Sequence, residues 1–399
     1  MKMSSSNLAI VCRWSFPESS GGVAMHNYNL IKAINSKIRC QIFSLKSKSN
    51  ELFYNELGIK YSGIKINSVY NNPHLLKLKF LKNTARYLSD NNISKIFRKK
   101  VNGEIGLVEF MDIHSEGYHF LKNKRGNRTN VIIRSHTPFS LLRKYFTKDE
   151  LKGVDALYTF EREKKCFEMA GQITTPSQDL KNQIIDLFNL SPDKINVIPN
   201  ILDTSHFRPI EIRKKKKFNI LHVGRFERPK GVETLIKAFI EVAKEFNDIN
   251  LINIGEPRGP SYNICQHLLK ENNLTDRVTF KGFVDYNSLP EYYSISDIVV
   301  APSEIYESFS YTVAQGMACG RPVIASKIGG IPQTLNNGTA GLLFNPGDVN
   351  DLTEKIISIY KNREDGDMLG KKARKFAVNQ FSIDVLSKRY LEYYKSIKT

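Results

Sequence analysis

The sequence has little of the chemistry that marks secreted, zinc-binding or membrane-spanning proteins. Its 5 cysteines are scattered and odd in number, with no CxxC pair, which argues against a disulfide framework and a structural zinc site. No window approaches the roughly 20 apolar residues of a membrane-spanning helix. The first apolar run, Leu8 to Cys12, is too short for a signal peptide and fits a first strand. We therefore predict a cytoplasmic protein, soluble or peripheral at the inner face of the membrane.

The chain carries an excess of positive charge. Its formal net charge is +19, and basic runs occupy residues 95–100, 122–128 and 213–217. Three interpretations stay open: a nucleic-acid or other anionic-polymer binder, contact with an anionic membrane surface, and ordinary solvated faces. No helix-turn-helix, RNP-like aromatic motif or zinc finger accompanies the charge, so we expect no nucleic-acid partner. The oligomeric state is not indicated.

Length and hydrophobic pattern predict two α/β domains. A chain of 399 residues exceeds what one core usually serves. Short apolar runs alternate with segments of helical periodicity, which is typical of parallel sheets. We predict domains at 1–205 and 206–381, followed by a final helix at about 382–399. The main predicted strands are 7–12, 39–45, 64–70, 105–110, 131–136, 195–200, 218–223, 249–254, 297–301 and 323–325, and the main predicted helices are 23–34, 75–100, 148–171, 232–246, 309–318 and 381–397.

One stretch of the second half organises the rest. A buried strand ends at Pro302, a helix begins near Phe309, and the loop between them carries the carboxylate of Glu307. Open α/β sheets bind ligands at the carboxyl ends of their strands, where helix N-termini also attract phosphate. An incidental acid in a helix cap is the plainer alternative.

This stretch, PSEIYESFSYTVAQGMACGRPVIAS, resembles the signature of the retaining glycosyltransferases of family 4. The resemblance implies the GT-B fold, in which two Rossmann-like domains face each other across a cleft and the C-terminal helix crosses back to the first domain. In that family two Glu residues bracket the helix start, the first holding donor-sugar hydroxyls and the second the ribose. Here the first is Glu307, and Gln315 stands at the second position. A neutral carboxamide accepts weaker hydrogen bonds than a carboxylate, so the grip on the nucleotide is expected to differ.

A second motif, VGRFERPKG at residues 223–231, resembles the family's diphosphate-binding loop. Arg225 and Lys230 lie on a loop that feeds a helix N-terminus, and their charges together with backbone dipoles suit a dianion. The segment from Arg277 to Val284 resembles the one whose backbone receives the nucleotide base. The donor-binding residues that the resemblance implies are Gly21, Gly22, Arg225, Lys230, Val278, Glu307, Ser308, Phe309, Ser310, Tyr311, Thr312, Val313 and Gln315.

The first half carries weaker signals. Gly21 and Gly22, followed by His26, resemble the family's loop facing the donor phosphate or the acceptor, although His26 could equally be a buried structural histidine. By the same resemblance His136, at a strand end, contacts the donor sugar and is needed for transfer. Glu109 and Asp112 could bind an acceptor hydroxyl or simply cap the next helix. The predicted catalytic residues are His136, Glu307, Arg225 and Lys230, and the predicted acceptor-binding residues are His26, Glu109 and Asp112.

The resemblance thus implies a retaining hexosyltransferase that uses a nucleoside-diphosphate sugar, with a UDP-sugar favoured over a GDP-sugar. It implies neither metal nor other cofactor, and a hydroxyl acceptor in cell-surface polysaccharide, lipopolysaccharide or glycolipid synthesis. Two alternatives remain on the same fold: a non-catalytic sugar-nucleotide binder, suggested by Gln315, and a non-hydrolysing sugar-nucleotide epimerase. The base, the sugar and the acceptor are not legible from the sequence.

Overall fold

A computed structural model describes residues 7–19, 21–65, 95, 97, 99, 105–112, 115–123, 129–145, 154–212 and 217–397. The chain divides into two compact units. Unit 1 comprises residues 1–201 and 386–399, and unit 2 comprises residues 202–385. The basic runs at 95–100, 122–128 and 213–217 and the predicted helix at 75–100 lie largely outside the described residues.

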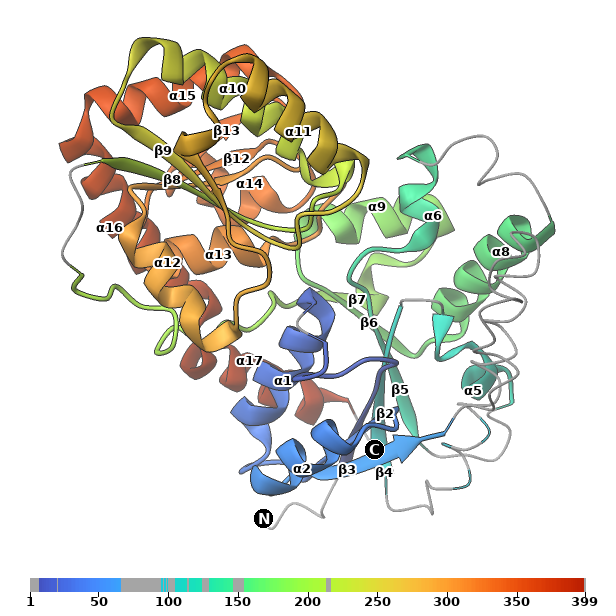
Figure 1. Cartoon of the computed structure of the whole chain (residues 1–399). Helices are drawn as coiled ribbons and strands as arrows, with labels where there is room; N and C mark the ends of the chain where they lie inside the picture. The colour runs from blue at the N-terminus through green and yellow to red at the C-terminus, as the bar shows by residue number, and fades with distance from the viewer. Residues whose placement is uncertain are drawn as a thin grey trace. The chain divides into compact units, whose positions relative to one another are not determined.

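Unit 1 is built on a parallel sheet in which the described strands have the order β3-β2-β1-β4-β5-β6-β7 (Figure 1). Its strands are β1 (Asn7–Val11), β2 (Cys40–Leu45), β3 (Lys60–Ile64), β4 (Ile105–Met111), β5 (Asn130–Arg134), β6 (Gln172–Thr175) and β7 (Ile195–Val197). Its helices are α1 (Gly22–Ile34), α2 (Lys48–Glu56), α5 (Tyr118–Lys122), α6 (Phe139–Leu142), α8 (Val154–Met169), α9 (Gln178–Phe188) and, from Leu386 onward, α17 (Ile383–Ser396).

Unit 2 has a parallel sheet in the order β10-β9-β8-β11-β12-β13. This order, three strands to each side of the first crossover, is that of a dinucleotide-binding Rossmann sheet. The strands are β8 (Phe218–Val223), β9 (Ile249–Ile254), β10 (Val278–Phe280), β11 (Ile298–Ala301), β12 (Val323–Ser326) and β13 (Leu342–Phe344). The helices are α10 (Val232–Glu245), α11 (Pro260–Glu271), α12 (Leu289–Ile295), α13 (Tyr311–Ala318), α14 (Ile331–Thr334), α15 (Val349–Lys361) and α16 (Arg363–Phe381).

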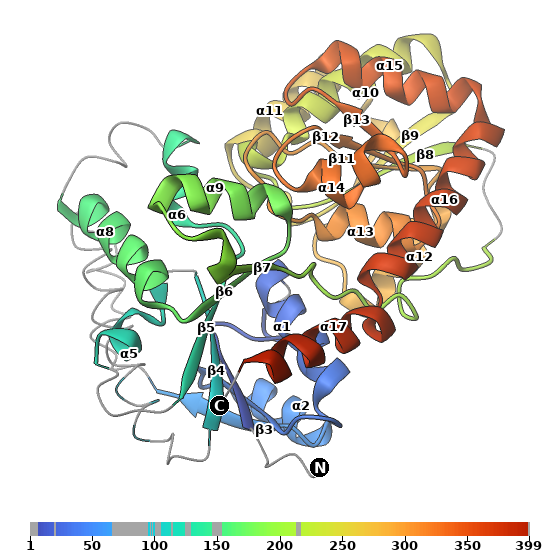
Figure 2. The ribbon, with the colours of Figure 1, turned by 180° about the vertical axis from the view of Figure 1, so that it is seen from behind.

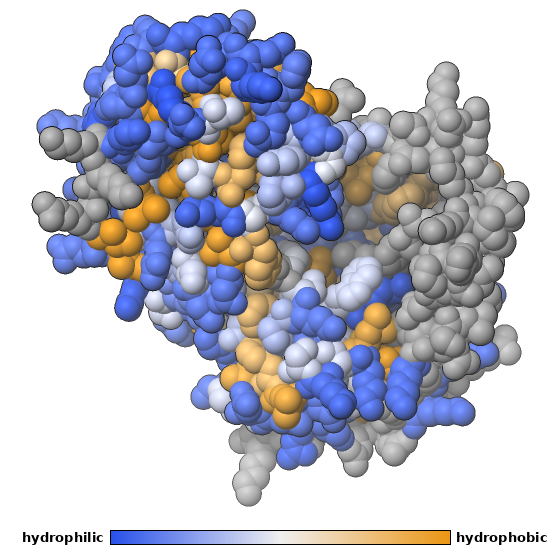
Figure 3. Space-filling model, viewed as in Figure 1, coloured by the Kyte–Doolittle hydropathy of each residue, from blue (hydrophilic) through white to orange (hydrophobic). Residues whose placement is uncertain are grey.

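Helices cover both faces of the unit 2 sheet (Figures 1 and 2), and a layer of buried apolar side chains lies on each face. Alternate residues of each strand point to opposite faces, so that Ile220 and Val300 pack against α10, α11 and α15, while Leu221 and Val299 pack against α12, α13 and α16. On the face seen in Figure 3, hydrophilic residues cover much of the described surface of this unit. Both faces of the sheet are therefore buried, and the ends of its strands are the part that a ligand can reach.

Two glycines let the loops at the carboxyl edge of this sheet pack closely. Gly231 has φ +68°, and a Cβ there would stand 1.7 Å from the carbonyl oxygen of Pro302. Gly329 has φ +56°, and a Cβ there would stand 2.3 Å from the carbonyl oxygen of Glu307. Only glycine allows both the left-handed backbone and the approach.

We expect Gly231→Ala to destabilise the protein by about 3 kcal/mol, because the new methyl group must push the Pro302 backbone away. Gly347→Ala is the matched control: its φ is +77°, but nothing lies within 4 Å of the added Cβ. Backbone strain alone should cost about 1 kcal/mol there. Denaturant unfolding of both variants measures the difference, and equal losses would contradict the close approach.

Some predicted elements of the first half differ from the structure. The third strand lies at Lys60–Ile64, before the predicted 64–70, and residues 66–70 are not described. None of the main predicted helices falls between β2 and β3, yet this stretch contains α2. This helix is mostly polar, but Ser47 caps its N-terminus and the buried Tyr54 anchors it.

Candidate donor and acceptor sites

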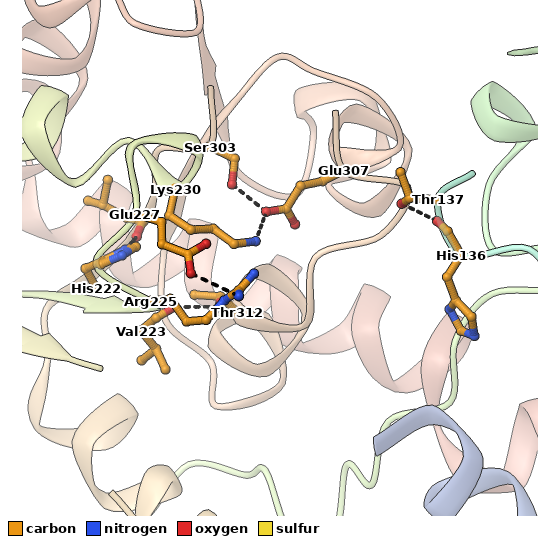
Figure 4. A network of polar contacts seen from close by, with 11 residues as sticks. His136, Thr137, His222, Val223, Arg225, Glu227, Lys230, Ser303, Glu307 and Thr312 are labelled. Atoms are coloured by element: carbon orange, nitrogen blue, oxygen red, sulfur yellow. Dashed lines mark hydrogen bonds and ion pairs between the residues drawn. The ribbon is translucent and has the colours of Figure 1, made fainter. Parts of the chain in front are cut away.

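A lysine and a glutamate meet at the carboxyl edge of the unit 2 sheet. Lys230 follows β8 and Glu307 follows β11, and these are neighbouring parallel strands whose carboxyl ends share an edge. The Nζ atom of Lys230 lies 2.5 Å from Oε1 of Glu307, and the Ser303 hydroxyl donates to the same oxygen at 2.6 Å (Figure 4). The motifs that the sequence singled out separately are thus joined in one cluster.

The pair is partly sheltered, which fixes its charge state. The Lys230 side chain is 30% exposed and that of Glu307 13%. Burial raises the pKa of the Glu307 carboxyl, but the Lys230 charge and the hydrogen bonds from Lys230 and Ser303 outweigh it, so the pKa lies below its usual value. Glu307 is therefore an ionised acceptor at neutral pH.

The loop that carries Glu307 is held from three sides. The backbone N–H of Glu304 donates to the carbonyl of Pro229, and the Thr234 hydroxyl donates to the Glu304 side chain at 2.6 Å. The N–H of Gly330, in the loop after β12, donates to the carbonyl of Glu307 at 2.7 Å. These ties position the carboxylate relative to Lys230.

The N-terminus of α13 reaches the same edge. The Thr312 hydroxyl donates to the carbonyl of Val223, the last residue of β8, at 2.8 Å (Figure 4). Ser310, the N-cap, makes no side-chain capping bond. The first N–H groups of a helix have no intrahelical acceptor, so this end of α13 can receive an anion.

Arg225 lies on the same loop as Lys230 but pairs with a different glutamate. Its side chain is 74% exposed, and Nη1 lies 3.1 Å from the Glu227 carboxylate. The prediction that Arg225 and Lys230 act as one clamp on a dianion stays untested, because each is held by its own glutamate in this structure.

The other predicted donor-binding residues differ in which of their groups a donor could contact. Gln315 is buried, and its Oε1 accepts a hydrogen bond from the Tyr293 hydroxyl at 2.8 Å. The side chains of Val278, Phe309 and Val313 belong to the cores, so these residues could offer a ligand little beyond their backbone. Ser308, Ser310 and Tyr311 lie on the same approach to α13.

Sequence reasoning missed His222, which lies in β8 behind the loop. Its Nδ1 lies 3.1 Å from the carbonyl oxygen of Val300, so that nitrogen carries the proton and Nε2 is a buried acceptor with no partner among the described residues. Burial is the main cause that lowers its pKa, to about 4, which keeps the ring neutral. His222 is a polar residue near the carboxyl end of a largely apolar strand, just before the loop that begins at Gly224, and this position was the signal that could have found it.

In unit 1 the two predicted histidines lie together. His26 of α1 and His136, just after β5, have ring centroids 5.3 Å apart. Burial, and then the charge of the buried Arg134, lowers the pKa of both well below its usual value. Both rings are therefore neutral, and Nε2 of His136 has no partner among the described residues.

Asp112 holds the turn that bears His136. Its Oδ2 accepts from the Ser135 hydroxyl and from the backbone N–H groups of His136 and Thr137, at 2.8, 3.0 and 3.1 Å. Asp112 is 1% exposed. Of the two roles considered for it, the capping one fits these contacts, although the turn that it caps is the one after β5.

Glu109 also lies in the interior of unit 1. It lies within β4, is fully buried, and accepts a hydrogen bond from the Tyr394 hydroxyl of α17 at 2.8 Å. Burial raises its pKa, although nearby Arg134 opposes this. Glu109 is therefore placed to hold α17 and not to meet an acceptor.

Asp112 predicts a pH dependence of stability. Burial raises the pKa of its carboxyl to about 6, from an ordinary value of 3.8. A raised folded-state pKa means that this group stabilises the fold fully below about 3.8 and loses that contribution as pH rises through about 6. We expect Asp112→Asn to remove up to about 3 kcal/mol of this loss, at about 1.4 kcal/mol per pKa unit. Unfolding measured from pH 4 to 7 tests this, and parallel curves for variant and parent would contradict it.

Two family models match the chain. The model described as Glycosyltransferase Family 4 matches residues 20–206, and the model described as Glycosyl transferases group 1 matches residues 203–376. The chain belongs to glycosyltransferase family 4. Its family 4 signature residues, Lys230 and Glu307, fall within the second match.

Among curated relatives, this family 4 chain is 28% identical over 238 residues to N-acetyl-alpha-D-glucosaminyl L-malate synthase of Bacillus anthracis. That match covers 58% of this chain and 61% of the relative. Two further curated relatives are covered over 64% and 53% of their length. The match thus spans less than two thirds of these proteins.

Solved structures show the fold. Sucrose-phosphate synthase from Thermosynechococcus elongatus has a TM-score of 0.82 at 21% identity, covering 98% of this chain and 99% of that one. Anabaena HepE in complex with UDP has a TM-score of 0.77 at 16% identity, covering 98% and 100%. The predicted fold class is confirmed: the family 4 chain has the GT-B fold of two Rossmann-like units.

Two features typical of other protein classes are absent from the described part of the chain. It contains no group of three or more His, Cys, Asp or Glu side chains that could hold a metal ion. None of its helices is both long enough and apolar enough to cross a membrane.

Proposed function

We propose that this chain is a retaining glycosyltransferase that moves a hexose from a nucleoside-diphosphate sugar to a hydroxyl acceptor. The observation that carries the proposal is the cluster of Lys230, Glu307 and Ser303 beside the N-terminus of α13, at the ligand-binding edge of a Rossmann sheet. The B. anthracis relative is named for a glucosaminyl product, and HepE structures hold UDP and UDP-glucose. These names favour a UDP-sugar as donor.

Unit 2 supplies the groups for the leaving diphosphate. The Lys230 ammonium and the N–H groups at the start of α13 offer positive charge that is already oriented when the diphosphate departs. Glu307 is an ionised acceptor next to that charge, which suits the hydroxyls of the transferred sugar. Lys230 would exchange part of its contact with Glu307 for phosphate oxygens.

Unit 1 would supply His136. Its ring is neutral, and its backbone is fixed by Asp112, so it can accept or donate a hydrogen bond in a constant position without adding charge. In the proposed retaining step the glycosidic bond to the diphosphate breaks, and the acceptor oxygen forms the new bond on the same face. The departing phosphate oxygen takes the acceptor proton.

We propose that transfer needs no divalent ion, because the fixed positive groups of unit 2 meet the diphosphate charge. Activity should persist unchanged in EDTA. Loss of turnover in EDTA that is restored by Mg²⁺ would contradict this.

The test of the function is a thermal-shift screen of UDP, GDP and ADP sugars, followed by a transfer assay with the stabilising donor over a panel of hydroxyl acceptors. We expect a rise in Tm with one donor class, and a new glycoside whose anomeric configuration matches that of the donor. No shift with any sugar nucleotide would overturn the proposal.

The second candidate function is a non-catalytic sugar-nucleotide binder. Gln315 favours it, because this carboxamide is uncharged and its oxygen already accepts from Tyr293. Calorimetric binding of a donor with no transfer or hydrolysis over the whole panel would support this candidate.

A further inference from the structure

Unit 1 contains a pocket at the amino ends of its strands β5 and β6, whereas His136 follows the carboxyl end of β5. The pocket has a volume of about 390 Å³. It is lined by Asn130 at the start of β5, Gln172 at the start of β6 and Asn196 in β7, together with Tyr393 and Ser396 near the end of α17. Because β5 begins at Asn130 and ends just before His136, the pocket and the predicted catalytic histidine lie at opposite ends of one strand.

The pocket has a built polar wall. Nδ2 of Asn196 donates to Oε1 of Gln172 at 3.2 Å, which orients the two carboxamides. This bond uses one proton of Asn196 and one lone pair of Gln172, so the NH₂ group of Gln172 and the carbonyl of Asn196 retain donors and acceptors for a ligand.

Tyr393 supplies the observation that points to an occupant. Its side chain is 9% exposed, and its hydroxyl makes no hydrogen bond of normal length and angle within the described residues. The Asn196 side chain lies near enough to lower the pKa of the phenol but not to satisfy the hydroxyl fully. A buried hydroxyl without a partner is unfavourable, so such a group is normally satisfied by a protein group, an ordered water or a bound ligand. Burial is the main cause that raises the pKa of this phenol, so it stays neutral and can both donate and accept.

The lining also limits the chemistry of the ligand. The described lining residues are carboxamides, hydroxyls, Gly171 and the aliphatic Val131 and Ile397, without an ionisable acid or base apart from the neutral phenol. Such a wall offers no counter-charge for phosphate or carboxylate. Groups that donate and accept at once match vicinal hydroxyls, and the volume lies at the small end of ligand pockets.

We propose that this pocket is a second, non-catalytic binding site for a neutral saccharide of one or two sugar units. The site goes beyond the transfer reaction, because it lies away from the strand ends that carry His136. Its ligand would contact α17, the helix that also holds Glu109 through Tyr394.

The test uses the full chain without nucleotide. Ligand-observed NMR saturation transfer and calorimetry would be run with methyl α-D-glucoside, methyl α-D-mannoside, methyl β-D-galactoside, N-acetylglucosamine and maltose. At least one sugar should bind saturably. Gln172→Leu, which removes the free NH₂ group, and Tyr393→Phe, which removes only the hydroxyl, should each weaken that binding about tenfold.

Controls separate this site from the proposed function. Gln380→Leu changes an exposed carboxamide of α16 in unit 2 and should leave sugar binding unchanged. UDP binding should be the same in Gln172→Leu, Tyr393→Phe and the parent. Sugar binding to the pocket is measured without nucleotide, so it can be interpreted even if the proposed donor site proves wrong. Absence of saturable binding by every sugar, or binding that His136→Ala abolishes while both pocket variants retain it, would overturn the second site.

Discussion

Lys230→Ala is expected to reduce kcat/KM by roughly 100- to 1,000-fold, the loss typical when one preorganised donor to a developing anion is removed. UDP affinity should fall by about tenfold or more, because an ammonium contact to phosphate is charge-assisted. The variant also leaves the partly buried Glu307 carboxylate with Ser303 as its remaining side-chain partner among the contacts described. Steady-state kinetics with the stabilising donor, and calorimetry with UDP, measure the two effects separately.

Lys244→Ala is the matched control. Lys244 lies at the other end of α10 and pairs with the exposed Glu241. A surface pair of this kind contributes little to stability, so its loss should change neither turnover nor UDP affinity. Wild-type turnover in Lys230→Ala would remove the ammonium from the mechanism.

Glu307→Gln is expected to lower kcat/KM by roughly 100-fold, through weaker holding of the donor sugar. The side chain keeps its shape and can still accept from Ser303, but it loses the charge that makes it a strong acceptor for sugar hydroxyls. UDP itself, which has no sugar to hold, should bind as tightly as before or more tightly, because Lys230 is released from its partner.

The neighbouring Glu304→Gln provides the comparison for Glu307→Gln. A carboxamide oxygen can still accept from Thr234, so the loop should keep its position and activity should fall by no more than a few fold. Equal losses in the two variants would show that the loop, and not the Glu307 charge, carries the effect.

The sequence predicted best where local pattern and burial agree. The apolar run before Pro302 corresponds to β11, and the helix expected at 309–318 corresponds to α13, shorter by the two residues that approach it. The helix α2 was missed because its single buried aromatic anchor, Tyr54, gives almost no hydrophobic periodicity. Its signal was a capping serine, Ser47, which is common in loops as well.

The site was predictable as motifs and not as contacts. Lys230 and Glu307 were each identified, but nothing local indicates that two residues 77 positions apart share a hydrogen bond. The role of Glu109 depends on Tyr394, 285 positions further along the chain. The local sequence around an acidic residue near a strand end is the same whether its partner is a ligand or a helix from the far end of the chain. The partner of such a residue could therefore be identified only from the structure.

The central claim is that the diphosphate of the donor lies beside Lys230 and the N-terminus of α13. A crystal structure of the full chain with UDP tests it most directly. We predict phosphate oxygens within hydrogen-bond distance of Lys230 Nζ and of the first backbone N–H groups of α13. UDP bound with its phosphates away from both groups would contradict the account.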